Sequence, residues 1–244
     1  MKITIVTGSR ADWGPLEWPI KTMQEDAFFQ GQILKIWGAT FDQAFRTCTD
    51  AFAAERPDVM LCLGDRFEIL AAATAAHLLR VPIVHIGGGD VTEGSYDDAM
   101  RDAVSRMSSI HFVTSTSAMA RIAHMGFRNI HLVGNPSIDY IRHADWKKER
   151  PIAEPYVVVS YQAETIDGGE FFDGYDLNEL HRTLPSTGKI VWIMPNPDLG
   201  SDGIRAYIEQ GRNEPNHIIY DFLPHAEFLN LLAHCEEFIG NSSA

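Results

Sequence analysis

The first half of the chain alternates short apolar runs with longer stretches in which apolar residues recur at helical spacing. The apolar runs are rich in β-branched residues and occupy 2–8, 32–38, 59–64, 82–87, 110–115 and 130–134. Between them the pattern predicts helices, among others over 15–24, 67–79 and 97–107. Nearly continuous apolar strands that alternate with helices are typical of a parallel sheet covered on both faces. Such a sheet binds its ligand beyond the carboxyl ends of its strands.

A charged stretch with two prolines, RHADWKKERPIAEP at 142–155, then interrupts the alternation and predicts a linker. The pattern resumes with strands predicted over 156–162, 189–196, 217–222 and 237–241 and helices predicted over 176–184, 201–211 and 225–235. We therefore expect an N-terminal Rossmann-like domain at 1–141, a linker at 142–155 and a partial C-terminal nucleotide-binding domain at 156–244. The predicted fold class is α/β, with two doubly wound domains, a cleft between them and a short second domain.

Composition narrows the class of ligand. The net charge of −13 argues against nucleic acid and membrane surfaces as partners, because both require a basic face. No apolar run approaches the roughly 20 residues of a membrane span, and no leader sequence is evident, so a cytoplasmic location is expected. Three unclustered cysteines suggest neither a disulfide framework nor a metal site. An anionic ligand would therefore need local arginines and helix N-termini.

Two loops that follow predicted strands carry candidate binding residues. In GSRADWG (8–14), Gly8 permits a close backbone approach and the guanidinium of Arg10 can fork onto a phosphate. In GDRFE (64–68), Asp65 and Arg66 stand at the end of a strand. Ordinary surface turns, with Asp65 as a helix N-cap, explain these residues about as well as a ligand does.

A third loop, GGGDVTEGSYDD at 87–98, is rich in glycine and acids. Asp97 and Asp98 would fall in the first turn of a helix, where the helix dipole favours negative charge, and capping alone would explain both. The sharper interpretation is a carboxylate cluster facing a sugar, because hydroxyl groups and proton transfer both call for acids. The loop lacks the alternating ligand spacing of a calcium site, so no metal or other cofactor is predicted.

Taken in order, the stretches GSRADWGPL, GDRFEILAAATAA, HIGGGDVTEGSYDDAMRDAVSRM, GNPSIDYI, MPNPDLGS, FLPHAEFLNLLAHC and GNSSA resemble the UDP-N-acetylglucosamine 2-epimerase family. The RAD triplet at 10–12 is similar to the hydrolysing branch, which forms N-acetylmannosamine. The resemblance runs from end to end, with one shortening between the second and third strands. It implies a glycosyltransferase-B type fold that binds a UDP-sugar in the cleft. It also implies a reaction that eliminates UDP across C1–C2 and then adds water.

The resemblance assigns site residues position by position. Arg10 falls near the nucleotide, Asn196 falls in a loop near the uridine, and Ser242 and Ser243 match serines that hold the diphosphate. Asp65, Arg66 and Asp97 match positions on the catalytic side of the cleft.

Three positions depart from the family pattern. Gly87 stands where the family has a glutamate, Gln162 replaces a histidine, and Asp102 follows Arg101 where the family has an Arg–His pair. Nearby acids that could replace the lost groups are Asp90, Glu93, Asp102 and Glu164, although each also suits a solvated loop. His85 is more typical of a packed histidine than of a base.

The chain ends on NSSA, the start of the diphosphate loop in the resemblance, so the second domain is expected to be incomplete. An exposed last strand would favour pairing with another chain and hence a homo-oligomer. Three functions stay open: the epimerase reaction, a different reaction on a related activated sugar, and a non-catalytic UDP-sugar-binding or assembly subunit.

Overall fold

The computed structural model describes residues 1–244 except 94, 164–181, 183, 185–187, 197–199 and 242–244, and it describes the backbone but not the side chains of Arg10 and Ala11. The chain forms two compact units, Met1–Ala144 and Asp145–Ala244. Within the part of the chain that the structure describes, no helix has the length and apolar character needed to cross a membrane.

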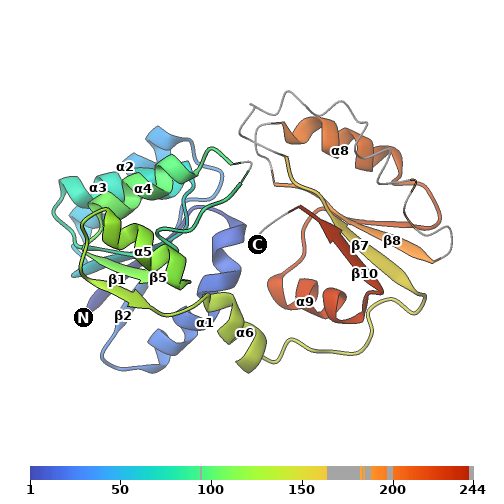
Figure 1. Ribbon diagram of the computed structural model, residues 1–244, viewed down its shortest axis with the longest axis horizontal. Helices are drawn as coiled ribbons and strands as arrows, with labels where there is room; N and C mark the ends of the chain where they lie inside the picture. The colour runs from blue at the N-terminus through green and yellow to red at the C-terminus, as the bar shows by residue number, and fades with distance from the viewer. Residues whose placement is uncertain (94, 164–181, 183, 185–187, 197–199, 242–244) are drawn as a thin grey trace. The chain divides into compact units, whose positions relative to one another are not determined.

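The first unit is built on a six-stranded parallel sheet with the order β2-β1-β3-β4-β5-β6 (Figure 1). Its strands are β1 (Lys2–Thr7), β2 (Gln30–Lys35), β3 (Val59–Leu63), β4 (Ile83–Ile86), β5 (Ile110–Val113) and β6 (Ile130–Leu132). From β1 the chain moves to β2 on one side and returns to β3 on the other. The topological switch point therefore lies between β1 and β3, where doubly wound sheets bind their ligands.

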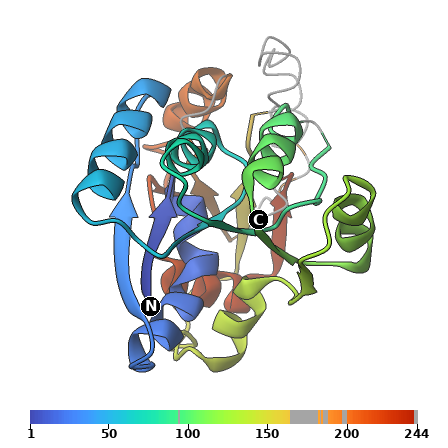
Figure 2. The same cartoon turned by 90° about the vertical axis from the view of Figure 1, so that its left-hand side faces the viewer.

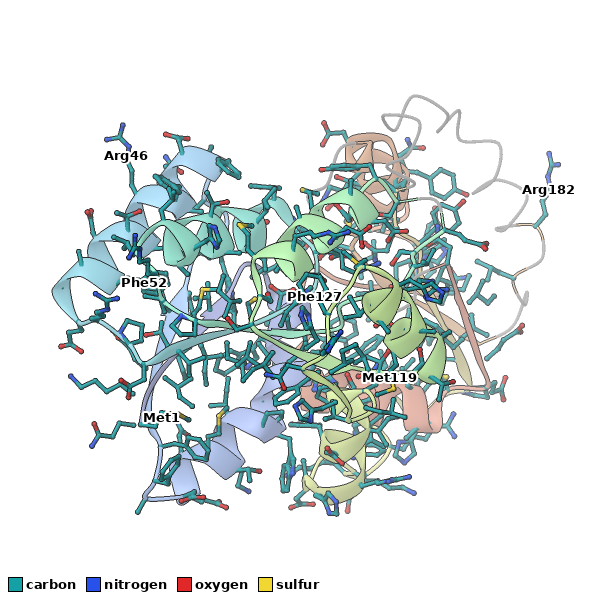
Figure 3. All side chains as sticks on the ribbon, turned by 60° about the vertical axis from the view of Figure 1, so that its left-hand side comes forward. Met1, Arg46, Phe52, Met119, Phe127 and Arg182 are labelled. Carbon is teal, nitrogen blue, oxygen red and sulfur yellow. The ribbon has the colours of Figure 1, made fainter. Side chains whose placement is uncertain are left out.

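Helices cover both faces of this sheet: α1 (Arg10–Glu25), α2 (Phe41–Ala54), α3 (Phe67–Leu78), α4 (Asp98–Met107), α5 (Thr116–His124) and α6 (Pro136–His143). Helices α1 and α6 pack together on one face, and α2, α3 and α4 pack side by side on the other (Figures 1 and 2). Phe52 is buried on the inner side of α2, whereas Arg46 on the same helix points away from the sheet (Figure 3).

Side chains that alternate along each strand build two hydrophobic cores, one on each face of the first sheet. In β1, Val6 faces the core beneath α2 and α3, while Ile3 and Ile5 face the core beneath α1. Since successive side chains of a strand point to opposite faces, a strand covered on both sides must be apolar at nearly every position. This is the reason that the apolar runs in the sequence were continuous.

The second unit carries a four-stranded parallel sheet in the order β10-β7-β8-β9. Its described elements are β7 (Tyr156–Ser160), β8 (Lys189–Ile193), α8 (Ser201–Gln210), β9 (His217–Tyr220), α9 (His225–His234) and β10 (Glu237–Gly240). Trp192 of β8 is almost fully buried in its core.

The predicted α/β class with two doubly wound, Rossmann-like units is confirmed, and every predicted strand is present within a few residues. Helices α2, α5 and α6 were not singled out in the sequence. The helix predicted over 176–184 falls mainly outside the described residues. Helix α1 begins at Arg10 rather than at Pro15, and Asp12, which was expected in the preceding loop, lies in its first turn.

Candidate active site

The turn after β1 is organised by the carboxylate of Asp12. Its Oδ2 accepts hydrogen bonds from the backbone N–H groups of Gly8 (2.8 Å) and Ser9 (2.9 Å), and its Oδ1 accepts from the Ser9 hydroxyl (3.2 Å). Asp12 is 5% exposed, and burial raises its pKa to about 6 despite these bonds and the charge of Arg66. The acid begins the helix by satisfying N–H groups that a helix start leaves unpaired.

The turn after β3 lies directly beside it. Gly64 has φ +86°, and Arg66 rather than Asp65 is the N-cap residue of α3. The Nε of Arg66 donates to Oε2 of Glu68 at 3.3 Å, and Glu68 is 3% exposed. Sequence reasoning passed over Glu68, because an acid in the first turn of a helix ordinarily serves the helix dipole.

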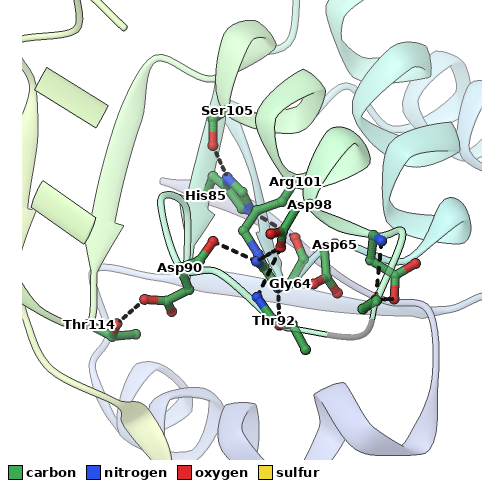
Figure 4. Close-up of polar contacts among 11 residues, drawn as sticks. Gly64, Asp65, His85, Asp90, Thr92, Asp98, Arg101, Ser105 and Thr114 are labelled. Carbon is green, nitrogen blue, oxygen red and sulfur yellow. Dashed lines mark hydrogen bonds and ion pairs between the residues drawn. The ribbon is translucent and has the colours of Figure 1, made fainter. Parts of the chain in front are cut away.

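Arg101 forms the centre of a buried polar cluster, drawn in Figure 4. Its guanidinium donates to the carboxylates of Asp65 and Asp98 and, at 3.0 Å, to the hydroxyl of Thr92. It also donates to the backbone carbonyl of Asp90 at 2.6 Å. A cation that is only 5% exposed thus fixes the ends of β3 and β4 and the start of α4.

The two acids that contact Arg101 differ in exposure. Asp98 is more exposed, and it also accepts from the backbone N–H of Thr92 at 3.1 Å. Burial raises the pKa of Asp65, and the Arg101 charge only partly opposes that rise. The carboxyl group of Asp65 therefore stays a weaker acid than an exposed aspartate although it is paired with Arg101, and perturbed pKa values of this kind are common at sites of proton exchange.

Asp90 lies on the other side of Arg101. Its Oδ1 accepts from the hydroxyl of Thr114 at 2.6 Å (Figure 4). Its Oδ2 lies 3.7 Å from the position that a Cβ on Gly87 would occupy. The carboxylate of Asp90 therefore lies next to Gly87, the position at which the family has a glutamate.

Asp97 is the N-cap residue of α4, and its Oδ2 accepts from the Ser95 hydroxyl at 2.7 Å. Its negative charge contributes to the raised pKa of Asp65. Asp102 is exposed and lines a cavity of about 310 Å³ together with Asp90 and Asp98. Within the described ranges, no group of three or more metal-ligating side chains comes together.

Behind the cluster, His85 of β4 connects the turn after β3 to α4. Its Nε2 must carry the proton, because it lies 2.8 Å from the carbonyl oxygen of Gly64, which can only accept. Its Nδ1 then accepts from the hydroxyl of Ser105 at 3.0 Å. Burial lowers the pKa of His85 to about 4, so the ring is neutral at pH 7. The expectation of a packed histidine fits this geometry.

The second unit brings together polar groups at the carboxyl ends of its own strands. Oε1 of Gln162 accepts from the backbone N–H of Asn196 at 3.0 Å. Gln162 and Asn241 are joined by two further bonds, from Gln162 N–H to Asn241 Oδ1 at 2.8 Å and from Asn241 Nδ2 to the Gln162 carbonyl at 2.9 Å. Gln162 therefore links the ends of β7, β8 and β10.

The predicted site residues thus fall into three groups. Asp65, Arg66 and Asp97 lie at the carboxyl edge of the first sheet, and Asn196 lies at that of the second. Arg10 begins α1 at the first edge. Ser242, Ser243 and Glu164 lie outside the described residues. The sequence did not reveal that Arg101 contacts Asp65 and Asp98, although the resemblance matched Arg101 to the arginine of the family's Arg–His pair.

Residues 35–244 match the family model described as UDP-N-acetylglucosamine 2-epimerase. The chain belongs to this family. Among its relatives, the UDP-N,N'-diacetylbacillosamine 2-epimerase (hydrolyzing) of Legionella pneumophila is 31% identical over 205 residues, which cover 80% of this chain and 54% of that protein. The UDP-N-acetylglucosamine 2-epimerase of Neisseria meningitidis is 28% identical over 196 residues, which cover 77% of this chain and 52% of that protein. The chain spans about half the length of these curated relatives.

Solved structures of the epimerase family share the fold. The UDP-GlcNAc 2-epimerase from Neisseria meningitidis, bound to UDP-GlcNAc, gives a TM-score of 0.78 at 16% identity, covering 100% of this chain and 78% of that one. The UDP-GlcNAc 2-epimerase from Methanocaldococcus jannaschii, in complex with UDP-GlcNAc and UDP, gives a TM-score of 0.76 at 16% identity. The match covers 99% of this chain and 79% of that one. These likenesses support the fold expected of an epimerase-family chain with two parallel-sheet units.

Proposed function

We propose that this chain carries the sugar-handling site of a hydrolysing UDP-N-acetylhexosamine 2-epimerase. The observation that carries the proposal is the placement of Asp65, Asp90 and Asp98 around the buried Arg101 at the carboxyl edge of the first sheet. Membership of the epimerase family supports it. In this proposal Arg10, Asn196, Ser242 and Ser243 bind the nucleotide and its diphosphate.

The proposed reaction has two steps. A base removes the proton from C2 of the sugar, and the electron pair of that C2–H bond forms a C1=C2 double bond. The C1–O bond breaks, and UDP leaves with the electron pair of the C1–O bond. An acid then gives a proton to C2 on the opposite face, and water adds its hydroxyl to C1. The remaining proton of the water passes to the carboxylate that the acid has become. The products are UDP and the free sugar with inverted C2.

Two carboxylates suit the two proton transfers. One oxygen of Asp90 is held by Thr114, and the other lies beside Gly87, where it can act as the base. Burial makes Asp65 a weaker acid than an exposed aspartate, so it is more readily protonated and can supply the proton to C2. Asp97 adds a negative charge that favours the protonated form of Asp65.

The proposal is tested by following the sugar protons by NMR after mixing the purified chain with UDP-N-acetylglucosamine. We expect UDP to be released and the signals of the 2-epimer to appear. Asp90→Asn and Asp65→Asn should each lower the rate by about 100- to 10,000-fold, the usual effect of removing an acid–base group. Glu93→Gln is the matched control, since Glu93 is an exposed acid of the same loop.

An unchanged sugar spectrum with saturation transfer to the uridine protons would overturn the reaction and favour a UDP-sugar-binding subunit. A rate of the Asp90→Asn variant equal to that of the unmodified chain would overturn the role of Asp90 and leave the remaining acids to be tested.

A further inference from the structure

Lys35, Trp13 and Trp37 form a group that the proposed reaction does not use, called here the Trp–Lys cup. The ammonium of Lys35, the last residue of β2, lies 4.0 Å from the ring centroid of Trp13 and 4.7 Å from that of Trp37. The two indoles meet edge to face, with centroids 6.3 Å apart at an interplanar angle of 75°. Cation–π attraction therefore fixes the position of the ammonium between two aromatic rings.

The Trp–Lys cup is held rigidly from below. Nε1 of Trp37 donates to the hydroxyl of Thr7 at 2.9 Å, and Thr7 is fully buried. The backbone N–H of Ile36 donates to the carbonyl of Thr7 at 3.0 Å. Trp37 nevertheless stays 37% exposed, and Lys35 is exposed too. Among the described ion pairs, none includes Lys35.

The cup lies on the same sheet edge as the carboxylates. Trp13 follows Asp12, whose carboxylate organises the turn after β1. Lys35 ends β2, which is two positions from β3 in the sheet. With neighbouring strands about 4.8 Å apart, the cup and the turn that carries Asp65 are separated by roughly 10 Å. The acetamido group is carried on C2, the carbon to which Asp65 is proposed to give a proton, so the side chain of Asp65, C2 and the acetamido group together have to span this separation.

The chemistry of the cup matches an acetamido group. The methyl of an acetamido group packs against an aromatic face, and its carbonyl oxygen accepts from an ammonium, which offers three donors and no acceptor. A diphosphate would use the ammonium but gain nothing from the exposed indole. An acidic side chain would be attracted to the same ammonium, yet none of the described ion pairs joins it to an acid.

We propose that the Trp–Lys cup is the subsite for an N-acetyl group of the sugar. This inference rests on the proposed function and deepens it, because it names the substituent by which the site selects acylated amino sugars. The relatives from Neisseria and Legionella are named for sugars that carry one and two N-acetyl groups, respectively.

The test compares the binding of UDP-N-acetylglucosamine, UDP-glucose and UDP to the full chain by isothermal titration calorimetry. UDP-glucose differs from the first ligand only in carrying a hydroxyl group at C2 in place of the acetamido group. We expect the chain to bind UDP-N-acetylglucosamine at least about tenfold more tightly, as for one charge-assisted hydrogen bond. Lys35→Met and Trp37→Leu should remove this preference and leave the affinities for UDP-glucose and UDP unchanged.

Trp18 and Lys21 provide a matched control pair on α1. Lys21 lies 4.8 Å above the ring of Trp18, which stacks on His143 of α6 instead of facing the ligand edge. Lys21→Met and Trp18→Leu should keep the preference for the acetylated ligand. Lys35→Met retains the aliphatic stem and serves as the decisive variant if Trp37→Leu lowers the melting temperature.

Each other outcome has a definite meaning. Equal affinity of the unmodified chain for UDP-N-acetylglucosamine and UDP-glucose overturns the acetamido subsite and leaves the proposed function standing. An equal loss of UDP binding in the cup variants would reassign the cup to the nucleotide and also overturn the inference. Failure of the unmodified chain to bind any of the three ligands overturns the proposed function and the inference together.

Discussion

His85 and His111 are partners in the register of β4 and β5, yet their hydrogen bonding is opposite. Both nitrogens of His85 are bonded, to Gly64 and Ser105. Neither nitrogen of His111 has a partner among the described residues, and its ring packs on Phe127 with centroids 4.5 Å apart. One buried histidine connects two elements of the candidate site, and the other fills space.

This contrast predicts opposite effects of the same substitution. His85→Leu leaves the Gly64 carbonyl and the Ser105 hydroxyl without a partner inside the protein, which should lower the free energy of unfolding by about 2–5 kcal/mol. His111→Leu loses no hydrogen bond to any described residue and removes a buried polar group, so it should be neutral or stabilising. Urea unfolding at pH 7.5 measures both. Equal losses for the two variants would mean that the His85 bonds contribute nothing to stability.

His85 also predicts an acid dependence of stability. Its pKa is lowered to about 4 in the folded state, against 6.5 for an ordinary histidine, because burial disfavours the charged ring. Between these values the unfolded chain binds a proton that the folded chain does not, so stability falls as the pH falls. The contribution of His85 to that loss is roughly 3 kcal/mol. Unfolding of the His85→Gln variant at several pH values should show a shallower decline.

Asp12 should change the stability with pH in the opposite direction to His85, over a similar pH range. Its pKa is raised from 3.8 to about 6, chiefly by burial, so the folded chain binds a proton more tightly than the unfolded chain between these values. That contribution is complete below about pH 3.8 and is lost as the pH rises through 6. Asp12→Asn should therefore raise the stability at pH 7.5 relative to pH 4, by about 2–3 kcal/mol at most. The amide oxygen can still accept from the Gly8 and Ser9 N–H groups. A variant whose loss of stability is the same at both pH values would contradict the raised pKa.

Arg101 is expected to stabilise the first unit through its charge. Arg101→Met leaves Asp65 partly buried without its cation, and breaking such a pair typically costs about 3–5 kcal/mol. Arg106, one turn further along α4, is exposed and serves as the control; Arg106→Met should change the unfolding free energy by about 1 kcal/mol at most. If Asp65→Asn in the Arg101→Met background recovers stability, the loss in the single variant came from the unpaired carboxylate.

The missing side chain at Gly87 cannot be restored without strain. Gly87 has φ +83°, and a Cβ there would find space, with Asp90 Oδ2 the nearest atom at 3.7 Å. Gly87→Ala should therefore cost about 1–2 kcal/mol from backbone conformation alone. Gly31 in β2 lacks a positive φ and has open space around its Cβ position, so Gly31→Ala should be neutral or slightly stabilising. Thermal unfolding measures both variants, and we expect a lower melting temperature for Gly87→Ala than for Gly31→Ala. Equal melting temperatures would count against backbone strain at Gly87.

The sequence by itself determined the α/β class, the order of the strands along the chain and the family. These features follow from local periodicity and from motifs whose order can be read without a structure. It also placed Asp65, Arg66 and Asp97 at strand ends or helix starts, because the carboxyl edge of a parallel sheet follows directly from where each apolar run stops.

Only the tertiary structure decided which of these groups work together. Arg101 reaches Asp65 because β3 and the start of α4 meet at one edge of the sheet, although the two residues lie far apart along the chain. In the same way Trp13 from the first turn of α1 meets Lys35 and Trp37 from the end of β2 above Thr7. Side-chain contacts of this kind depend on strand order and on which helix covers which face. Neither is written in the local pattern, since the same apolar runs can be paired in more than one order.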